Sequence, residues 1–204
     1  MEYSETWFGG SGPGFDTDGR ANRVLIRTDS GFRLMVDPES EPAPTFTATR
    51  VDLTGDGVPE FVEVNDYDFL RVRDGKSDEI LEMVGDLALK PSGMSGTPVR
   101  LGDGRMALHV TSIMVPAEDR EGLAAAGGTS DASDHDLLAV WDQEIGALKD
   151  ISDRRLNDGG REWSWGSAAG DINGDGLEDL VVAEGLIESL AFDCGFRIYL
   201  QRPD

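Results

Sequence analysis

Residues 171–179, D-I-N-G-D-G-L-E-D, carry oxygen donors at alternate positions. Counted from the first residue as position 1, the donors at positions 1, 3, 5, 7 (a backbone carbonyl) and 9 are Asp171, Asn173, Asp175, Leu177 and Asp179. Glycines at positions 4 and 6 permit the sharp turns that point alternate residues at one centre. A hard cation of the size of Ca2+ takes about six to eight oxygens in irregular geometry. The spacing therefore predicts a calcium-binding loop.

Residues 52–60 repeat this spacing with weaker donors. The corresponding positions hold Asp52, Thr54, Asp56, Val58 (through its carbonyl) and Glu60. Thr54 is uncharged, and Glu60 is longer than aspartate by one methylene group. We therefore expect a second calcium site that is poorer than the first or differently shaped.

Two further segments keep only parts of the pattern. Asp16, Asp18 and Asn22 stand at positions 3, 5 and 9 of an N-terminal copy, but Gly14 stands at position 1. We expect partial or no occupancy there. The copy at residues 101–107 retains only Asp103 among the acids, and we expect no metal in it. The chain is thus predicted to bind Ca2+ at one or two sites, with the N-terminal copy as a third candidate.

Other metal-binding motifs fit these loops less well. An EF-hand needs a helix on each side of its loop, whereas residues 52–60 are flanked by T-F-T-A-T-R-V and F-V-E-V-N, which are rich in strand formers. The loop at 171–179 has Val182 at position 12, where an EF-hand places a bidentate acid. Zinc prefers nitrogen and sulfur ligands, and no histidine or cysteine lies near either loop.

The elements around the loops are predicted to be strands. Short β-branched and aromatic runs bounded by turn residues recur along the chain, and helical periodicity is confined to residues 78–90 and 117–126. The strand–acidic turn–strand pattern recurs about four times, which indicates one domain over 1–204 with repeat units at about 1–40, 41–92, 93–152 and 153–204. A small, polar stretch within about 117–134 is predicted to be a loop insertion. The fold class is therefore all-β.

The sequence D-I-N-G-D-G-L-E-D-L-V-V, preceded by W-S-W-G-S-A-A-G, resembles the FG-GAP/VCBS repeats of integrin-α-type β-propellers and of many secreted bacterial proteins. The resemblance covers about half of the chain, and it is strongest over 163–183 and good over 46–64. It implies a β-propeller-like array of about four blades, either a small closed propeller or part of a larger ring. It also implies calcium in the loop between the first two strands of a blade.

Composition and the N-terminal sequence restrict the kinds of partner and the cellular location that we expect. The net charge of −22 makes this an acidic protein and argues against binding nucleic acid. No apolar run reaches the roughly 18 residues of a membrane span. The N-terminal M-E-Y-S-E-T-W-F-G-G lacks the features of a signal peptide. We expect an extracytoplasmic protein, secreted or periplasmic, seen here as a mature form or a fragment.

Two kinds of function remain, a binding module and an enzyme. The first is a calcium-stabilised module for protein–protein interaction, acting as an accessory or scaffold subunit of a larger assembly. The alternatives are a glycan-binding module, for which tryptophans such as Trp141 would supply platforms, and a secreted calcium-dependent hydrolase. The only histidines, His109 and His135, show no metal-ligand spacing, and no serine elbow is present. We therefore assign no catalytic residues.

Overall fold

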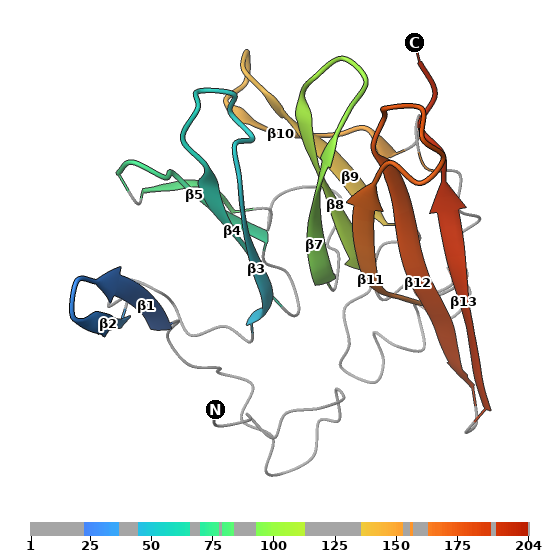
Figure 1. Cartoon of the computed structure of the whole chain (residues 1–204), viewed down its shortest axis with the longest axis horizontal. Helices are drawn as coiled ribbons and strands as arrows, with labels where there is room; N and C mark the ends of the chain where they lie inside the picture. Colours follow the sequence, from blue (N-terminus) through green and yellow to red (C-terminus); the bar gives the residue numbers. More distant parts are fainter. Residues whose placement is uncertain are drawn as a thin grey trace, which may run out of the picture. The chain divides into compact units, whose positions relative to one another are not determined.

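The computed structural model describes residues 23–36, 45–65, 70–77, 79–83, 93–112, 136–152, 156, 163–188 and 191–203. The chain divides into two compact units, Met1–Thr45 and Phe46–Asp204. The described residues form thirteen strands in four antiparallel sheets (Figure 1), which confirms the all-β prediction. The candidate ligands Asp16, Asp18 and Asn22, together with the predicted insertion at 117–134, lie outside the described residues.

The first unit contributes one described element, a β-hairpin. Its strands are β1 (Arg23–Thr28) and β2 (Gly31–Val36), paired from Arg23↔Val36 to Thr28↔Gly31. The two-residue turn between them is closed by Thr28, whose hydroxyl donates to the Gly31 carbonyl at 3.1 Å.

The second unit holds two four-stranded sheets and one three-stranded sheet. The β3–β6 sheet consists of β3 (Thr45–Val51), β4 (Glu60–Asn65), β5 (Leu70–Arg73) and β6 (Ile80–Met83). The β7–β10 sheet consists of β7 (Gly93–Arg100), β8 (Met106–Ser112), β9 (Leu137–Asp142) and β10 (Ala147–Asp150). The β11–β13 sheet consists of β11 (Trp163–Gly170), β12 (Asp179–Glu188) and β13 (Ala191–Tyr199). Each strand pairs with its neighbour in the chain, so the sheets are meanders.

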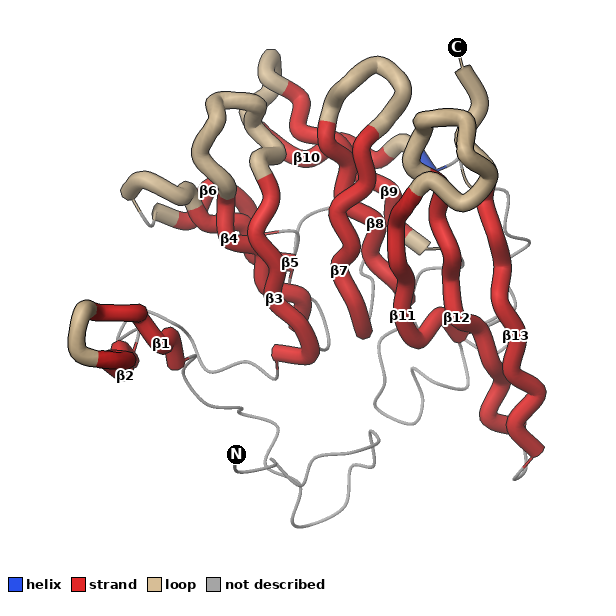
Figure 2. Tube along the Cα trace, viewed as in Figure 1, coloured by secondary structure: helices blue, strands red, loops and turns tan. Residues whose placement is uncertain are grey.

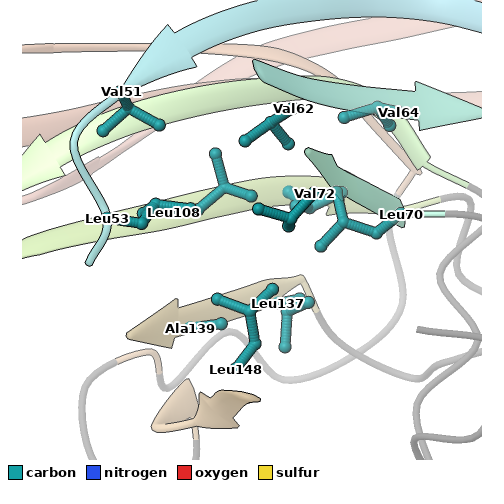
Figure 3. Close-up of a cluster of buried hydrophobic side chains, with 11 residues drawn as sticks. Val51, Leu53, Val62, Val64, Leu70, Val72, Leu108, Leu137, Ala139 and Leu148 are labelled. Carbon is teal, nitrogen blue, oxygen red and sulfur yellow. The ribbon is translucent and has the colours of Figure 1, made fainter. Parts of the chain in front are cut away.

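The inner strands β8 and β9 of the β7–β10 sheet are buried on both faces, and this explains their largely apolar sequences. On one face, Leu108 and Leu137 join Val62 and Val72 of the β3–β6 sheet in one core cluster (Figure 3). On the other face, alternate residues such as Leu138 pack with residues of the β11–β13 sheet in a second cluster. Because successive side chains of a strand point to opposite faces, a strand between two cores has no face exposed to solvent.

The strand β7 was not predicted, because its sequence G-M-S-G-T-P-V-R lacks apolar alternation. Close packing accounts for one glycine, since a Cβ on Gly96 would lie 2.8 Å from Cγ2 of Val64. Pro98 is tolerated because β7 is an edge strand of its sheet, where a missing N–H need not break a ladder. Here tertiary packing decides the structure rather than strand propensity.

The helix expected at 78–90 is wrong for its described part. Ile80–Met83 forms β6 and pairs with β5. The turn before it favours a hairpin, since the backbone N–H of Asp74 donates to the Glu79 carbonyl at 2.8 Å. The apolar spacing of this segment suits a helix, but the free edge of β5 gives its backbone a ladder of hydrogen bonds.

Candidate metal-binding loops

Two loops of the second unit have the same backbone shape, as their matching sequences predict. One joins β3 to β4 and contains residues 52–59; the other joins β11 to β12 and contains residues 171–178 (Figure 2). We name them the Asp52 loop and the Asp171 loop. Positions 4 and 6 are left-handed in both, with φ of 75° at Gly55, 85° at Gly57, 80° at Gly174 and 87° at Gly176. Side chains with a Cβ rarely adopt this conformation, so the glycines fix the turn.

The acids at position 9 are buried and hold the start of each loop. Glu60 is 1 % exposed and accepts from the backbone N–H of Leu53 at 2.7 Å. Asp179 is 0 % exposed and accepts from the N–H of Ile172, the equivalent residue, at 3.0 Å. These carboxylates therefore act as local anchors for the backbone, whether or not an ion is present.

The acids at positions 1 and 5 also make the same hydrogen bonds in both loops. Position 1 accepts from the glycine N–H at position 6, and the distance is 2.9 Å both from Asp52 to Gly57 and from Asp171 to Gly176. Position 5 accepts from the N–H at position 7. These last bonds measure 2.8 Å from Asp56 to Val58 and 2.9 Å from Asp175 to Leu177.

The Asp52 loop differs by holding a group of carboxylates with one unsatisfied oxygen. Oxygens of Asp52, Asp56 and Glu60 all lie within 4.8 Å of one another. Oδ1 of Asp52 is buried and has no hydrogen-bond partner among the described residues. The hydroxyl of Thr54, a predicted ligand, lies beside the group and donates to Glu60 at 3.0 Å. Three clustered carboxylates with an unsatisfied buried oxygen could hold a metal ion.

In the Asp171 loop the corresponding oxygens accept hydrogen bonds from the protein. Oδ1 of Asp171 accepts from the backbone N–H groups of Gly174 at 2.7 Å and Asp175 at 3.1 Å. The second oxygen of Asp179 accepts from the N–H of Gln201 at 2.9 Å. Asn173 donates its amide N–H to Asp175 at 3.0 Å. The three acids of this loop form no group like that of the Asp52 loop.

Glutamine side chains tie each loop to a neighbouring part of the second unit. Gln201 donates to the carbonyls of Arg100 at 3.0 Å and Glu178 at 2.7 Å, and accepts from the N–H of Gly102 at 2.5 Å. Gln143, in the turn after β9, donates to the Thr54 carbonyl. The loops therefore help to hold adjacent sheets together, a role that local sequence does not reveal.

A lysine reaches the Asp52 loop from the β5–β6 turn. The Lys76 ammonium donates to Oδ2 of Asp56 at 2.5 Å. This bond, with a smaller contribution from the Val58 N–H, lowers the pKa of Asp56 below its ordinary value of 3.8. The same bond raises the pKa of Lys76. Sequence reasoning missed Lys76, because it is twenty residues from Asp56 along the chain.

The turn between β7 and β8 shows how a related loop is closed by a cation of the protein itself. Arg105 donates two guanidinium N–H bonds to Oδ2 of Asp103, at 2.8 and 2.7 Å. Its backbone N–H donates to the other oxygen of Asp103 at 3.0 Å. The carboxylate of this degenerate copy is therefore neutralised locally.

A buried polar chain containing His109 links the β7–β10 sheet to β11. Nδ1 of His109 lies 2.9 Å from the hydroxyl of Ser167, and Nε2 lies 3.4 Å from Oδ2 of Asp136. Ser167 donates onward to Thr97 at 2.8 Å. Although the trio resembles a nucleophile–base arrangement, His109 is 0 % exposed. A substrate cannot reach the imidazole, so the geometry gives the trio a structural role.

One face of the β11–β13 sheet is apolar and exposed. Phe196 is 78 % and Ile198 53 % exposed. They lie opposite Ala183 and Val181 of β12, whereas the other face of this sheet packs in the second core cluster. The β13 strand also ends the sheet order (Figure 1), so among the described residues no strand lies beyond it.

Fold and loops together define an all-β protein built from repeated strand–acidic loop–strand units. Residues 163–186 match the family model of the FG-GAP repeat. This segment contains the Asp171 loop, and the match confirms the resemblance to FG-GAP repeats over these residues. No curated protein and no solved structure matches the chain. No described helix is long and apolar enough to cross a membrane.

Proposed function

We propose that the protein is a calcium-binding β-propeller-type module that works outside the cytoplasm in protein–protein interaction, as an accessory or scaffold subunit of a larger assembly. The observation that carries the proposal is the carboxylate group of the Asp52 loop, in a chain whose residues 163–186 match the FG-GAP repeat. The arrangement of sheets that share a core with the next sheet supports a propeller-like array of about four blades.

The donor set of the loops suits calcium. Every predicted ligand offers oxygen, and the unsatisfied oxygen of Asp52 would gain a partner from a bound ion. The ion would be held in the Asp52 loop by the side chains of Asp52, Thr54, Asp56 and Glu60 and by the Val58 carbonyl. In the Asp171 loop it would be held by Asp171, Asn173, Asp175, Asp179 and the Leu177 carbonyl.

The proposed role of calcium is architectural. An ion at the Asp52 loop offsets the repulsion between carboxylates whose oxygens lie within 4.8 Å. Because Gln143 joins this loop to the turn after β9, a fixed loop also fixes the neighbouring sheet. Extracellular calcium, at about millimolar concentration, is sufficient for weak sites of this kind. This is the reason for proposing an extracytoplasmic location.

The calcium proposal is tested by thermal unfolding and ion counting. At a calcium concentration of about 100 times the dissociation constant, binding stabilises the folded state by about 2.7 kcal/mol. For a chain of this length that raises the midpoint by roughly 5–10 °C over the value in EDTA. Native mass spectrometry of Asp52→Asn should show one calcium ion fewer than the wild type. The matched control, Asp103→Asn, removes the same charge from a loop closed by Arg105 and should keep the count.

An unchanged midpoint in EDTA and in about 10 mM calcium, with no ion in the native mass, would refute the calcium proposal. Equal loss of calcium in Asp52→Asn and Asp103→Asn would show that the assignment to the Asp52 loop is wrong.

The exposed face of the β11–β13 sheet supports the interaction part of the proposal. Contiguous exposed apolar side chains mark interaction surfaces in soluble proteins. A photo-reactive residue at position 196 should form adducts with a protein partner in the native host. Position 145, where Ile145 is 66 % exposed in a turn, is the matched control. If position 196 gives no adduct beyond those from position 145, this face is not the interaction surface.

A further inference from the structure

The Lys76 ammonium makes a contact with the Asp52 loop that a neutral side-chain amide makes within the Asp171 loop. The second oxygen of the position-5 acid accepts from the Lys76 ammonium at 2.5 Å in the Asp52 loop. In the Asp171 loop the same oxygen of Asp175 accepts from the side-chain amide of Asn173 at 3.0 Å. The two loops share their glycine conformations and three side-chain-to-backbone hydrogen bonds, and this contact is one of the differences between them.

The turn that carries Lys76 is held in shape by its own hydrogen bonds and lies close to the Asp52 loop. Oδ1 of Asp74 accepts from the backbone N–H groups of Lys76 and Ser77, both at 2.7 Å. Gly75 lies so close to the loop that a Cβ there would be 2.2 Å from the Pro59 carbonyl oxygen. Although the Lys76 side chain is 55 % exposed, its backbone is fixed beside Asp56. The ammonium is therefore part of the local structure of the loop.

An ammonium group and a metal ion compete for the oxygens of one carboxylate. The oxygen that accepts from Lys76 is not free to bind a cation, and a divalent ion bound nearby would be repelled by the positive charge. Lysine is a compact, strongly hydrated point charge, so it readily returns to water when displaced. The Asn173 amide sets no such charge against a metal in the Asp171 loop.

We propose that the Lys76 ammonium competes with calcium for the Asp56 carboxylate. By occupying Asp56, Lys76 lowers the affinity of the Asp52 loop for calcium. The inference rests on the proposed calcium binding and adds a residue that sets affinity. In this scheme the loop is closed by Lys76 at low calcium and by the metal at high calcium. Binding of the ion releases Lys76 from the Asp52 loop.

The test is calorimetric titration of the wild type, Lys76→Met and Lys149→Met with calcium. Lys149→Met is the matched control, because Lys149 is 60 % exposed and pairs with Asp142 at 3.3 Å. Removing one unit of nearby positive charge should tighten one site by about tenfold, the order expected for an exposed charge pair acting on a divalent ion. Lys149→Met should change affinity by less than about twofold. In the Asp52→Asn background the effect of Lys76→Met should disappear.

The outcomes separate the inference from the proposed function. If the wild type binds calcium but Lys76→Met binds no more tightly than Lys149→Met, only the inference fails. Weaker binding by Lys76→Met would overturn it too, because Lys76 would then be organising the loop for the ion. If neither the wild type nor Lys76→Met binds calcium, both fail. Binding by Lys76→Met alone supports competition and refutes calcium binding by the Asp52 loop of the natural chain.

Discussion

Asp179→Asn tests whether the position-9 acid is an anchor of the fold independently of any metal. The Asp179 carboxylate is fully buried and accepts from two backbone N–H groups, those of Ile172 at 3.0 Å and Gln201 at 2.9 Å. Asparagine keeps one oxygen and places an NH2 group against the other donor. One N–H thus loses its acceptor, and the remaining bond loses its charge assistance.

The expected cost follows from these two bonds. A hydrogen bond to a charged group contributes about 1.5–3 kcal/mol, and an unsatisfied buried donor costs about 1–3 kcal/mol. Relief from burying a negative charge offsets part of this sum. We expect Asp179→Asn to lower the free energy of unfolding by about 3 kcal/mol. For a unit of this size, that corresponds to a drop of about 6–12 °C in the midpoint.

Urea and thermal unfolding in EDTA measure this effect without calcium. The control is Asp175→Asn, which removes the same charge from an exposed residue of the same loop and should cost about 1 kcal/mol or less. If Asp179→Asn stays within about 0.5 kcal/mol of the wild type in EDTA, the anchoring role is refuted. If it destabilises the protein only when calcium is present, its role is limited to binding the metal.

Three further predictions concern the core, the turn and pH. Leu108→Ala should lower the free energy of unfolding by about 2–5 kcal/mol, because Leu108 is fully buried in the first core cluster. Urea titration measures this loss, and a loss below about 1 kcal/mol would contradict the packing. Gly75→Ala should lower the thermal midpoint, because its Cβ would lie 2.2 Å from the Pro59 carbonyl oxygen, and an unchanged midpoint would show that this contact relaxes freely. The pKa of Asp56 is lowered chiefly by Lys76, so their pair stabilises the fold above the ordinary pKa of 3.8 and loses that effect as pH falls through the lower folded value. The stability difference between the wild type and Lys76→Met should therefore be constant between about pH 6 and 8 and shrink below about pH 4, and a difference that grows in acid would contradict the pair.

Sequence patterns predicted the strands that are continuous apolar or β-branched runs. Runs such as 137–141 and 180–183 were recognisable because they are apolar and β-branched, and they form β9 and β12. The strands β6 and β10 were missed because they have only four residues each, and β7 was missed because it lacks apolar alternation. Gly96 shows the reason most directly, because only the approach of Val64 explains a glycine there.

The loops could be located from sequence, but their surroundings could not. Ligand spacing identified Asp52 and Asp171 as the first residues of two similar turns, and the structure gives both turns the same backbone shape. The contacts that distinguish the loops come from Lys76, twenty residues from Asp56, and from Gln201, twenty-two residues from Asp179. No local pattern links such partners, because the folding of the sheets brings them together.

The turn closed by Asp103 and Arg105 bears on how strongly the fold depends on dissolved ions. Its negative charge is neutralised by a guanidinium two residues away, so the turn keeps its shape with a tethered cation. A turn of this kind therefore needs no dissolved ion to neutralise its carboxylate. If the Asp52 loop binds calcium as proposed, one chain combines a turn that depends on an ion with a turn that does not, and the calcium dependence of its stability is confined to part of the fold.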